Sequence, residues 1–287
     1  MRHLLTFALF AASPLAAQAP AAVVPPPSSA VKKAAATITA SDVARRVHVI
    51  ADDSMMGRDT PSPGLEMTAQ YVADQFKSFG LKPGGENGTW FQRYDILQVQ
   101  FDPAESHVGF MAGGKHVHAE FATDARYMGG TAPDKEIGGP VVVIGGKPNR
   151  DALSGMDATG KVVVVVMDYS KGPTAGGMGQ MIGAVYALHP LGVVILSNRD
   201  SAGWANRMKA PYRPGIRLAG AEGRPPVVEV NDAALASVLA AGGVDVAKIR
   251  ADTSTVILTD PGLKVMIDLK ETVLKKSSAP NTIGILE

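Results

Sequence analysis

The chain has 287 residues, which is enough for one large domain or two small ones with a buried core. Hydrophobic residues make up 46% of the chain, a share that excludes disorder along its whole length. The formal net charge of +1 argues against a nucleic-acid binder, which would carry an excess of basic residues on one face. There is no cysteine, so stability has to come from packing without disulfides.

Residues 1–21 have the pattern of an export signal. Arg2 and His3 give a short positive start, an apolar run follows from Leu4 to Leu15, and small residues come next. Cleavage is expected after Ala17, Ala19 or Ala21. The apolar run is shorter than the roughly 20 residues that a membrane-spanning helix needs. We therefore predict a secreted or periplasmic protein with no membrane span after cleavage.

Residues 22–40 are rich in Ala and Pro and are predicted to form a flexible linker. Residues 41–105 are predicted to be a largely helical segment. Ser41 and Asp42 are candidate N-caps for a short first helix. The second helix is predicted from an apolar stripe at spacings of three and four, and Gly80 ends it; the stripe consists of Leu65, Ala69, Val72, Phe76 and Phe79. An aromatic, strand-like segment follows from Trp90 to Phe101.

The middle of the chain is predicted to be rich in strands. A hairpin is expected over residues 106–121, with its turn at Gly113-Gly114, and a buried strand at Val141–Ile144. The valine run Val162–Val166 is typical of a strand covered on both faces. A helix over residues 180–188 and a second buried strand at Val193–Leu196 complete a strand–helix–strand unit.

The last part of the chain alternates loops and short elements. Residues 201–223 are predicted to be a long basic loop, followed by a strand at Val227–Val230 and a helix capped by Asp232. Two further strands are expected at Thr255–Leu258 and Val265–Leu269. An apolar strand begins at Asn281, and we expect the natural sequence to continue beyond it. The predicted fold class is mixed α/β (α+β), a β-rich domain with a few helices behind an N-terminal helical segment.

Three stretches resemble secreted zinc aminopeptidases of metallopeptidase family 28. Ile50–Phe91 is similar to the N-terminal region of that family, with its "GR…PG" loop, a helix that ends in "GLKP", and an Asn-Gly-Thr turn before an aromatic residue. Val141–Ile249 resembles the protease-associated (PA) domain inserted in many members, through "GKVVVV", "GVVIL" and "PVVEV". Residues 281–286 resemble the "NxIGxL" strand that opens the catalytic domain.

The resemblance implies a division into a peptidase segment at 41–105, a PA domain at 106–270 and the start of a truncated catalytic domain at 271–287. It implies an N-terminal fragment of an enzyme that hydrolyses peptides, in which the PA domain shapes substrate access. The implied partner is a peptide or protein substrate. The alternative is a free-standing exported module that binds peptide or protein without catalysis. If the chain acts alone, the helix face at 65–79 lacks its family partner, and we expect self-association through it.

The resemblance also implies two zinc ions in the complete enzyme, but the family's H-x-D motif does not occur here. We therefore expect no catalytic, cofactor-binding or metal-binding residues in this chain, no cofactor of its own, and no activity of the chain alone. There is no G-x-S-x-G motif either. One unrelated metal candidate is the run His116, His118 and Glu120, which share one face of a strand. A solvated hairpin face is the favoured interpretation of that alternation.

Three other patterns have a functional and a simpler interpretation. Gly177-Met178-Gly179 before a helix suggests a nucleotide site, but loop glycines are favoured because the glycines do not follow the strand directly. Asp52-Asp53 is interpreted as solvated charge, and Asn87-Gly88-Thr89 as a turn that also matches a glycosylation sequon. The basic segment could contact an anionic or peptide ligand, although an ordinary solvated loop is favoured; it contains Arg199, Arg207, Lys209, Arg213 and Arg217 with Trp204 and Tyr212.

Overall fold

The computed structural model describes residues 28–146, 151–170, 177–221 and 223–287. The predicted signal peptide lies outside these residues. The chain divides into two compact units, Met1–Gly57 and Arg58–Glu287. In the first unit, helix α1 (Ser29–Ala35) lies within the segment expected to be linker, and α2 (Ala40–Ala51) precedes the 3₁₀ turn η1 (Asp53–Arg58). The α2 cap is Thr39 in a capping box with Asp42, so the predicted cap at Ser41 or Asp42 is wrong.

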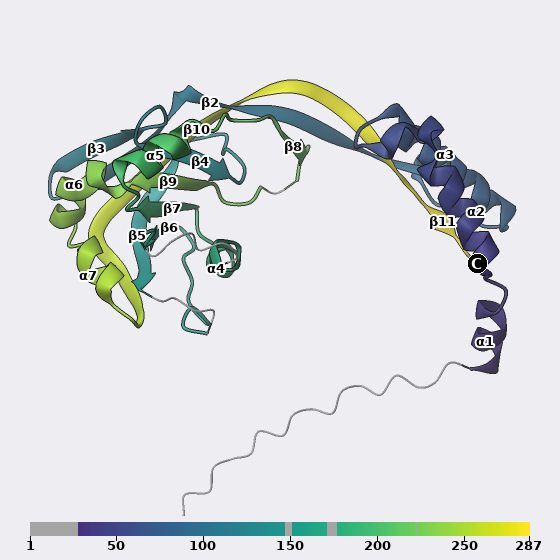
Figure 1. The fold of residues 1–287 in the computed structure, drawn as a ribbon, viewed down its shortest axis with the longest axis horizontal. Coiled ribbons are helices and arrows are strands. Elements are labelled where there is room, and N and C mark those ends of the chain that lie inside the picture. Colours follow the sequence, from purple (N-terminus) through teal and green to yellow (C-terminus); the bar gives the residue numbers. More distant parts are fainter. Residues whose placement is uncertain (1–27, 147–150, 171–176, 222) are drawn as a thin grey trace, which may run out of the picture. The chain divides into compact units, whose positions relative to one another are not determined.

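The second unit is built on a mixed sheet (Figure 1). Among the described residues its strand order is β3-β2-β10-β5-β6-β7-β9-β4, and β8 pairs with β2 outside this path. The neighbouring strands β5, β6, β7 and β9 are parallel to one another. On either side of them, β10 pairs antiparallel with β5, and β4 pairs antiparallel with β9. The strands are β2 (Phe91–Ala112), β3 (Lys115–Glu120), β4 (Ala125–Gly129), β5 (Ile137–Gly146), β6 (Val162–Val166), β7 (Gly192–Ser197), β8 (Gly215–Leu218), β9 (Val227–Asn231) and β10 (Thr255–Thr282).

The parallel strands are buried on both faces, as the valine run predicts. All five valines of β6 are at most 4% exposed. Alternate side chains belong to two separate cores: Val162, Val164 and Val166 to one, and Val163 and Val165 to the other. The predicted strand–helix–strand unit is present as β6, α4 (Gly177–Tyr186) and β7.

The helices that cover the sheet differ from the sequence prediction in three places. The segment predicted to be one long loop contains α5 (Ser201–Met208) and β8, so that prediction is wrong. Asp200 caps α5, and Trp204 is the only side chain of that helix described as buried, which leaves almost no apolar stripe to detect. The predicted helix after β9 is present as η3 (Asp232–Leu235) and α6 (Ala236–Ala241), but Asn231 caps it in place of Asp232. Helix α7 (Val246–Ala251) was not predicted.

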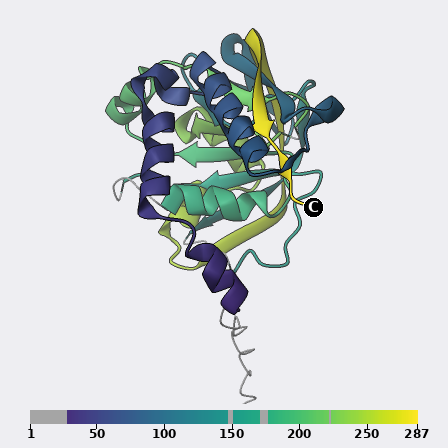
Figure 2. The same cartoon turned by 90° about the vertical axis from the view of Figure 1, so that its right-hand side faces the viewer.

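Strands β2 and β10 form a long antiparallel ribbon whose pairing runs from Met111 with Lys264 to Phe91 with Thr282. The ribbon extends from the sheet to α3 (Pro63–Ser78), and Figure 2 shows this end of β10 beside that helix. There the Thr282 hydroxyl donates a hydrogen bond to the Ala69 carbonyl at 3.2 Å. The expected domain boundaries at 105/106 and 270/271 both fall inside these continuous strands.

At the end of the ribbon, β1 (Lys82–Pro83) pairs antiparallel with β11 (Gly284–Ile285), and the turn η2 (Glu86–Gly88) precedes β2. This packing is close: a Cβ on Gly284 would lie 2.7 Å from side-chain atoms of both Phe76 and Leu81. The predicted apolar stripe of α3 is partly covered. Ala69 is buried, whereas Phe79 is 55% exposed. Self-association through this face stays a prediction.

The predicted mixed α/β class is confirmed by the sheet and its covering helices. Within the described part of the chain, no helix combines the length and apolar character needed to cross a membrane.

Candidate functional site

Two adjoining pockets lie where β8 meets the sheet, and both are lined by Arg217. Pairing with β2 places β8, with Arg217 opposite Leu97 and Gly215 opposite Val99. The first, here called the loop pocket, has a volume of about 540 Å³ and lies between β8 and the loops before β5 and β9. The second, the aromatic pocket, has a volume of about 300 Å³ and lies between β8, β4 and β10. Arg217 is therefore common to both.

Three aromatic rings line the aromatic pocket. The Phe101 ring centroid is 4.6 Å from that of Tyr127 and 4.8 Å from that of Tyr212. The Arg126 guanidinium lies over the Tyr212 ring at 4.6 Å from its centroid, a cation–π contact that fixes the plane of the guanidinium. The Tyr212 hydroxyl accepts a hydrogen bond from the Tyr127 backbone N–H at 3.3 Å. These contacts fix the wall of the pocket before any ligand arrives.

Glu271 of β10 is the one carboxylate that lines the aromatic pocket. Its side chain is only 8% exposed, and its Oε2 lies 3.7 Å from Arg217 Nη1, which is too long for a hydrogen bond. Its Oε1 is 3.4 Å from the Tyr127 hydroxyl, which donates at 2.9 Å to the Gly130 carbonyl. Glu271 Oε2 and Arg217 Nε are both buried without a hydrogen-bond partner among the described residues. Such atoms are rare in folded proteins, because each costs part of its hydration energy.

The pKa values in the aromatic pocket are shifted mainly by burial. Burial raises the pKa of the Glu271 carboxyl, and the nearby Arg217 guanidinium only partly offsets this. The pKa of the Tyr127 hydroxyl is raised by burial and then by the negative charge of Glu271. Burial also raises the pKa of Tyr212. The phenols therefore stay neutral, and Glu271 takes up a proton more readily than an exposed glutamate does.

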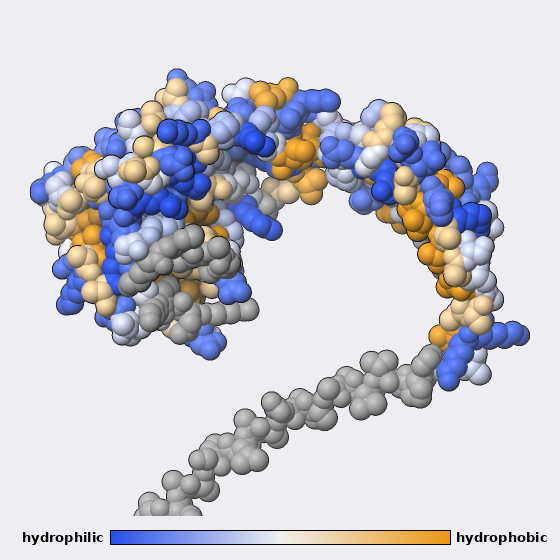
Figure 3. Space-filling view, in the orientation of Figure 1, coloured by the Kyte–Doolittle hydropathy of each residue, from blue (hydrophilic) through white to orange (hydrophobic). Residues whose placement is uncertain are grey.

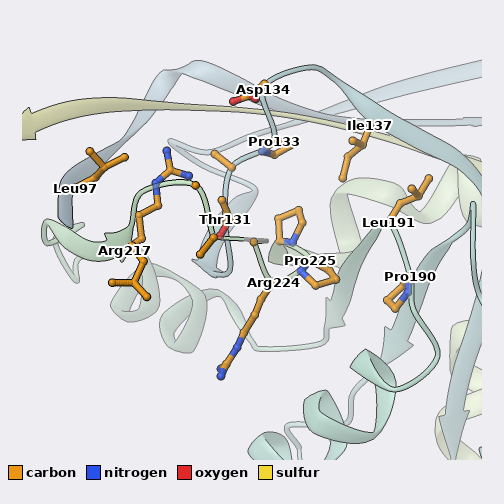
Figure 4. Close-up of a pocket in the computed structure, with 16 residues that line it drawn as sticks. Leu97, Thr131, Pro133, Asp134, Ile137, Pro190, Leu191, Arg217, Arg224 and Pro225 are labelled. Carbon is orange, nitrogen blue, oxygen red and sulfur yellow. The ribbon is translucent and has the colours of Figure 1, made fainter. Parts of the chain in front are cut away.

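The loop pocket is lined by prolines, glycines, aliphatic side chains and a few charged ones, several of which Figure 4 shows. Its charged side chains are Asp134, Arg217 and Arg224. The Arg224 side chain extends away from Arg217 in this view. The polar groups of the loop pocket do not converge as those of the aromatic pocket do, so the aromatic pocket is the stronger candidate site.

Two arginines of the predicted basic loop have a structural role. Arg199 Nε and Arg207 Nε donate to the two oxygens of Glu229 at 3.0 and 2.9 Å, and Glu229 is fully buried. Arg199 also lies over the Tyr169 ring at 3.8 Å from its centroid. Trp204 is buried, and its indole N–H donates to the Thr123 carbonyl. Of the segment predicted to contact a ligand, Tyr212, Arg213 and Arg217 line a pocket.

The structure does not bring the metal candidate together. His116, His118 and Glu120 lie on the exposed face of β3, whereas Ala119 between them is buried. No set of three or more His, Cys, Asp or Glu side chains among the described residues is placed to hold a metal ion. The favoured interpretation, a solvated hairpin face, matches this burial pattern, and the Gly113-Gly114 turn lies where it was predicted.

The remaining candidates are exposed or outside the described residues. Asp52 and Asp53 are exposed, Asp52 being the C-cap of α2. Asn87 is exposed in the turn η2, with a positive φ of 53° that suits Asn in a turn. Gly177 opens α4, but residues 171–176, which connect it to β6, lie outside the described part.

Sequence alone could not locate the aromatic pocket. Phe101, Arg217 and Glu271 are far apart in the chain and meet because β8 and β10 both pair with β2. Arg126 comes from β4, which pairs with β9. The one signal in the sequence was the pairing of basic and aromatic residues at 212–217.

Comparisons with known proteins give one distant similarity to report. No model of a protein family matches the sequence, and no curated protein matches it. Among solved structures, the chain is similar to the crystal structure of a peptidase M28 precursor from Shewanella amazonensis SB2B, with 11% identity and a TM-score of 0.33. The match covers 78% of this chain and 45% of that one, so this chain spans less than half the length of that protein.

Proposed function

We propose that this chain is the N-terminal part of a secreted zinc-dependent aminopeptidase of metallopeptidase family 28. The residues of the sheet, from β2 to β10, correspond in this proposal to the PA domain, which shapes access of peptide substrates to a catalytic domain. The proposal starts from the resemblance of three stretches of sequence, at 50–91, 141–249 and 281–286.

One observation in the structure carries the proposal: the pairing of β1 with β11. Lys82 pairs with Ile285 and Pro83 with Gly284. The "GLKP" and "NxIGxL" stretches, which resemble the peptidase domain, therefore lie side by side although about 200 residues separate them. The stretch that resembles the PA domain lies between them in the sequence and supplies β6, β7, β8, β9 and most of β5 to the mixed sheet. This is the topology of a domain inserted into another one.

The packing around this pair supports an ordered start of a second domain. Phe76 of α3 lies against Gly284, and its ring centroid is 6.4 Å from that of Trp90. Glu66 of α3 forms a two-bond ion pair with Arg93 of β2, at 2.9 and 2.8 Å. Helix, strand pair and ribbon end are thus held to one another.

The described residues do not fit a zinc site, since none of their acidic, histidine or cysteine side chains form a suitable group. No catalytic step is assigned to them. In this proposal the zinc ions and the glutamate base belong to a catalytic domain outside this chain. This chain supplies helix α3 of that domain, the β1–β11 pair and the PA domain.

The deciding experiment is to read the gene in frame beyond the codon for Glu287 and to purify its complete product. We expect coding sequence with an H-x-D motif, bound zinc by elemental analysis, and release of leucine from leucine p-nitroanilide that 1,10-phenanthroline abolishes. N-terminal sequencing of the exported protein should show that residues 1–21 are removed. A stop codon directly after Glu287, with neither zinc nor activity, would overturn the proposal.

That last outcome would favour the alternative, an exported module that binds peptides without catalysis. The aromatic pocket supports this alternative, because its lining of charged and aromatic side chains comes from this chain and requires no zinc ion.

A further inference from the structure

We propose that the free edge of β8 binds an extended polypeptide segment of another protein, in which apolar and acidic residues alternate. The segment would pair with β8 as an additional strand of the sheet. The site consists of β8 and the side chains beside it, all of them in this chain. It therefore stands or falls independently of the proposed aminopeptidase activity.

One edge of β8 pairs with β2, and the other edge is open. Directly after the strand, the Ala219 N–H donates to the Asp95 carbonyl at 2.9 Å. Hydrogen-bonded residues alternate along an antiparallel pair, so the backbone groups of Arg217 also face β2, and those of Ile216 and Leu218 face the opposite edge. Among the described residues, β2 is the only strand that pairs with β8. The backbone groups of Ile216 and Leu218 can therefore pair with a further strand.

The side chains at this edge are accessible. Ile216 is 62% exposed and Leu218 is 51% exposed, and no residue of β8 is buried. The two aliphatic side chains are two residues apart, so they share one face of the strand. Figure 3 shows a hydrophobic patch in the region of β8. An exposed apolar edge is uncommon in natural sheets, because it invites pairing with another chain.

The two end strands of the sheet are protected, which distinguishes them from β8. At β4, the Tyr127 N–H already donates to the Tyr212 hydroxyl at 3.3 Å. At β3, the exposed residues all carry ionisable side chains: Lys115, His116, His118 and Glu120. Covering an edge and placing charges on it both prevent edge-to-edge pairing. Strand β8 has neither protection at its free edge, since its one charged side chain, Arg217, lies beside Glu271.

The charge around β8 indicates an acidic partner. Residues 209–221 contain three basic residues and no acidic one. Strand β10 adds the exposed Lys275 and Lys276, which lie level with β8 on the far side of β2. Two acidic residues, Asp95 and Asp134, lie near one end of β8, so the excess of charge is positive. Acidic side chains on an added strand would be attracted.

A second copy of this chain fits the edge less well than an acidic segment. Two β8 strands paired antiparallel about a twofold axis would place Arg217 of one copy opposite Arg217 of the other. Like charges directly opposite one another destabilise a strand pair. In a partner segment, an acidic residue at that position would be attracted, and its apolar neighbours would meet Ile216 and Leu218 on the other face. This is why the proposed segment alternates acidic and apolar residues.

The test uses the full 287-residue chain and the blocked peptide acetyl-Glu-Val-Glu-Val-Glu-amide. Acetylation removes the free amine that an aminopeptidase substrate needs, so binding does not depend on any catalytic domain. We expect binding, measured by amide chemical-shift changes centred on residues 215–219. The charge-reversed acetyl-Lys-Val-Lys-Val-Lys-amide should bind about tenfold more weakly or worse. Equal binding by the two peptides, or no binding by the acidic one, would overturn the proposal.

N-methylation of the peptide tests the backbone pairing without changing the protein. In an antiparallel strand, the valines opposite Ile216 and Leu218 turn their N–H groups toward β8, and the glutamate N–H groups face away. N-methylated valines should therefore weaken binding by about tenfold, whereas N-methylated glutamates should leave it unchanged. The reverse pattern would mean a parallel strand and would still support pairing. If both peptides behave alike, no strand is added and the proposal is wrong.

Ile216→Pro tests the same edge from the side of the protein. It removes a backbone donor from the free edge and keeps the pairing with β2, because that N–H faces away from β2. Binding of the acidic peptide should weaken by about tenfold. Ile216→Ala is the matched control, which shortens the side chain but keeps the N–H, so we expect a loss of only about threefold. Equal losses would contradict strand pairing. If Ile216→Pro does not fold, the N-methylated peptides decide the question.

The charge is tested by the double variant Lys275→Gln and Lys276→Gln, which should weaken binding of the acidic peptide by about threefold. The matched control replaces Lys32 and Lys33, two adjacent exposed lysines of α1, by glutamine, and binding should be unchanged. Equal effects of the two double variants would mean non-specific attraction and would remove the argument for an acidic partner.

Two further outcomes would assign the edge to a different occupant and so refute the proposal. The first is dimerisation of the wild-type chain in analytical ultracentrifugation that Ile216→Pro abolishes, which would assign the edge to a second copy. The second is binding to vesicles of phosphatidylglycerol and phosphatidylcholine that Ile216→Ala weakens, without binding of the acidic peptide. That result would assign the apolar patch to a membrane surface.

Discussion

Replacing the buried Glu229 by glutamine is expected to destabilise the fold more than any surface change. Glu229 lies in strand β9, between β7 and the edge strand β4, and has no exposed surface. It accepts hydrogen bonds from Arg199 at 3.0 Å and from Arg207 at 2.9 Å. Glutamine keeps the shape but turns one acceptor into an N–H₂ group that faces an arginine donor. Both arginines then lose the charge that compensates them.

The magnitude follows from the exposure of the three side chains. Breaking a buried ion pair by removing one partner costs about 3–5 kcal/mol. The arginine side chains are 29% and 27% exposed, so water can solvate them in part. We therefore expect the lower end for Glu229→Gln, about 3 kcal/mol of unfolding free energy. For a unit of this size that corresponds to a decrease of about 6–12 °C in melting temperature.

The assay is urea denaturation of the full chain, followed by circular dichroism. Glu105→Gln, the same chemical change at an exposed position, is the control and should alter stability by less than about 0.5 kcal/mol. A loss of less than about 1 kcal/mol for Glu229→Gln would refute the reasoning. Replacing Glu229, Arg199 and Arg207 together by apolar residues of similar volume should restore most of the lost stability, because no charge then stays buried without a partner.

Three further predictions can be measured by the same denaturation assay. Leu196→Ala, at a fully buried position of β7, should lose about 2–5 kcal/mol by leaving a cavity. Gly146→Ala should lower the free energy of unfolding by about 2–4 kcal/mol, because φ is +70° and a Cβ would lie 2.1 Å from the Ser254 carbonyl oxygen. The control Gly155→Ala has a similar φ of +77° but open space around it, so it should lower the free energy of unfolding by only about 1 kcal/mol. Burial raises the folded-state pKa of Glu271 above its unfolded value, so the stability that this group contributes is lost as pH rises through the folded pKa. Glu271→Gln should remove this decrease of unfolding free energy with pH. If the decrease is unchanged in the variant, another group causes it.

The sequence predicted those elements whose side chains alternate between water and core or are buried throughout. The valine run of β6, the hairpin turn at Gly113-Gly114 and the strand at 193–196 all appear in the structure. Their signals are local, because burial on a face imposes a period of two or a continuous apolar run. Helix α5 carries no such signal, since its packing depends on one buried tryptophan.

Strand β10 shows why the rest could not be predicted. Asp260-Pro261-Gly262 has the composition of a turn, and the structure has positive φ at Asp260 and Gly262. Pairing with β5 is interrupted between Thr259 and Lys264, yet the strand continues on the far side. Beyond Leu269 its side chains are mostly polar, because that part pairs with β2 outside the main cores. Its extended conformation is imposed by a partner strand about 170 residues away, which no local pattern records.

The same dependence on distant pairing explains why the candidate site was found only in the structure. Arg217 was singled out in the sequence as one basic residue among several, and Glu271 was not singled out at all. Their surroundings in the fold distinguish these residues. Arg199 and Arg207 each donate to the buried Glu229, whereas the buried Nε of Arg217 has no hydrogen-bond partner among the described residues. The first two arginines stabilise the fold through a shared buried acceptor, and Arg217 lines the aromatic pocket. The partners of each arginine in the folded chain, and not the number of basic residues, therefore separate the structural part of the basic segment from the part that lines the candidate site.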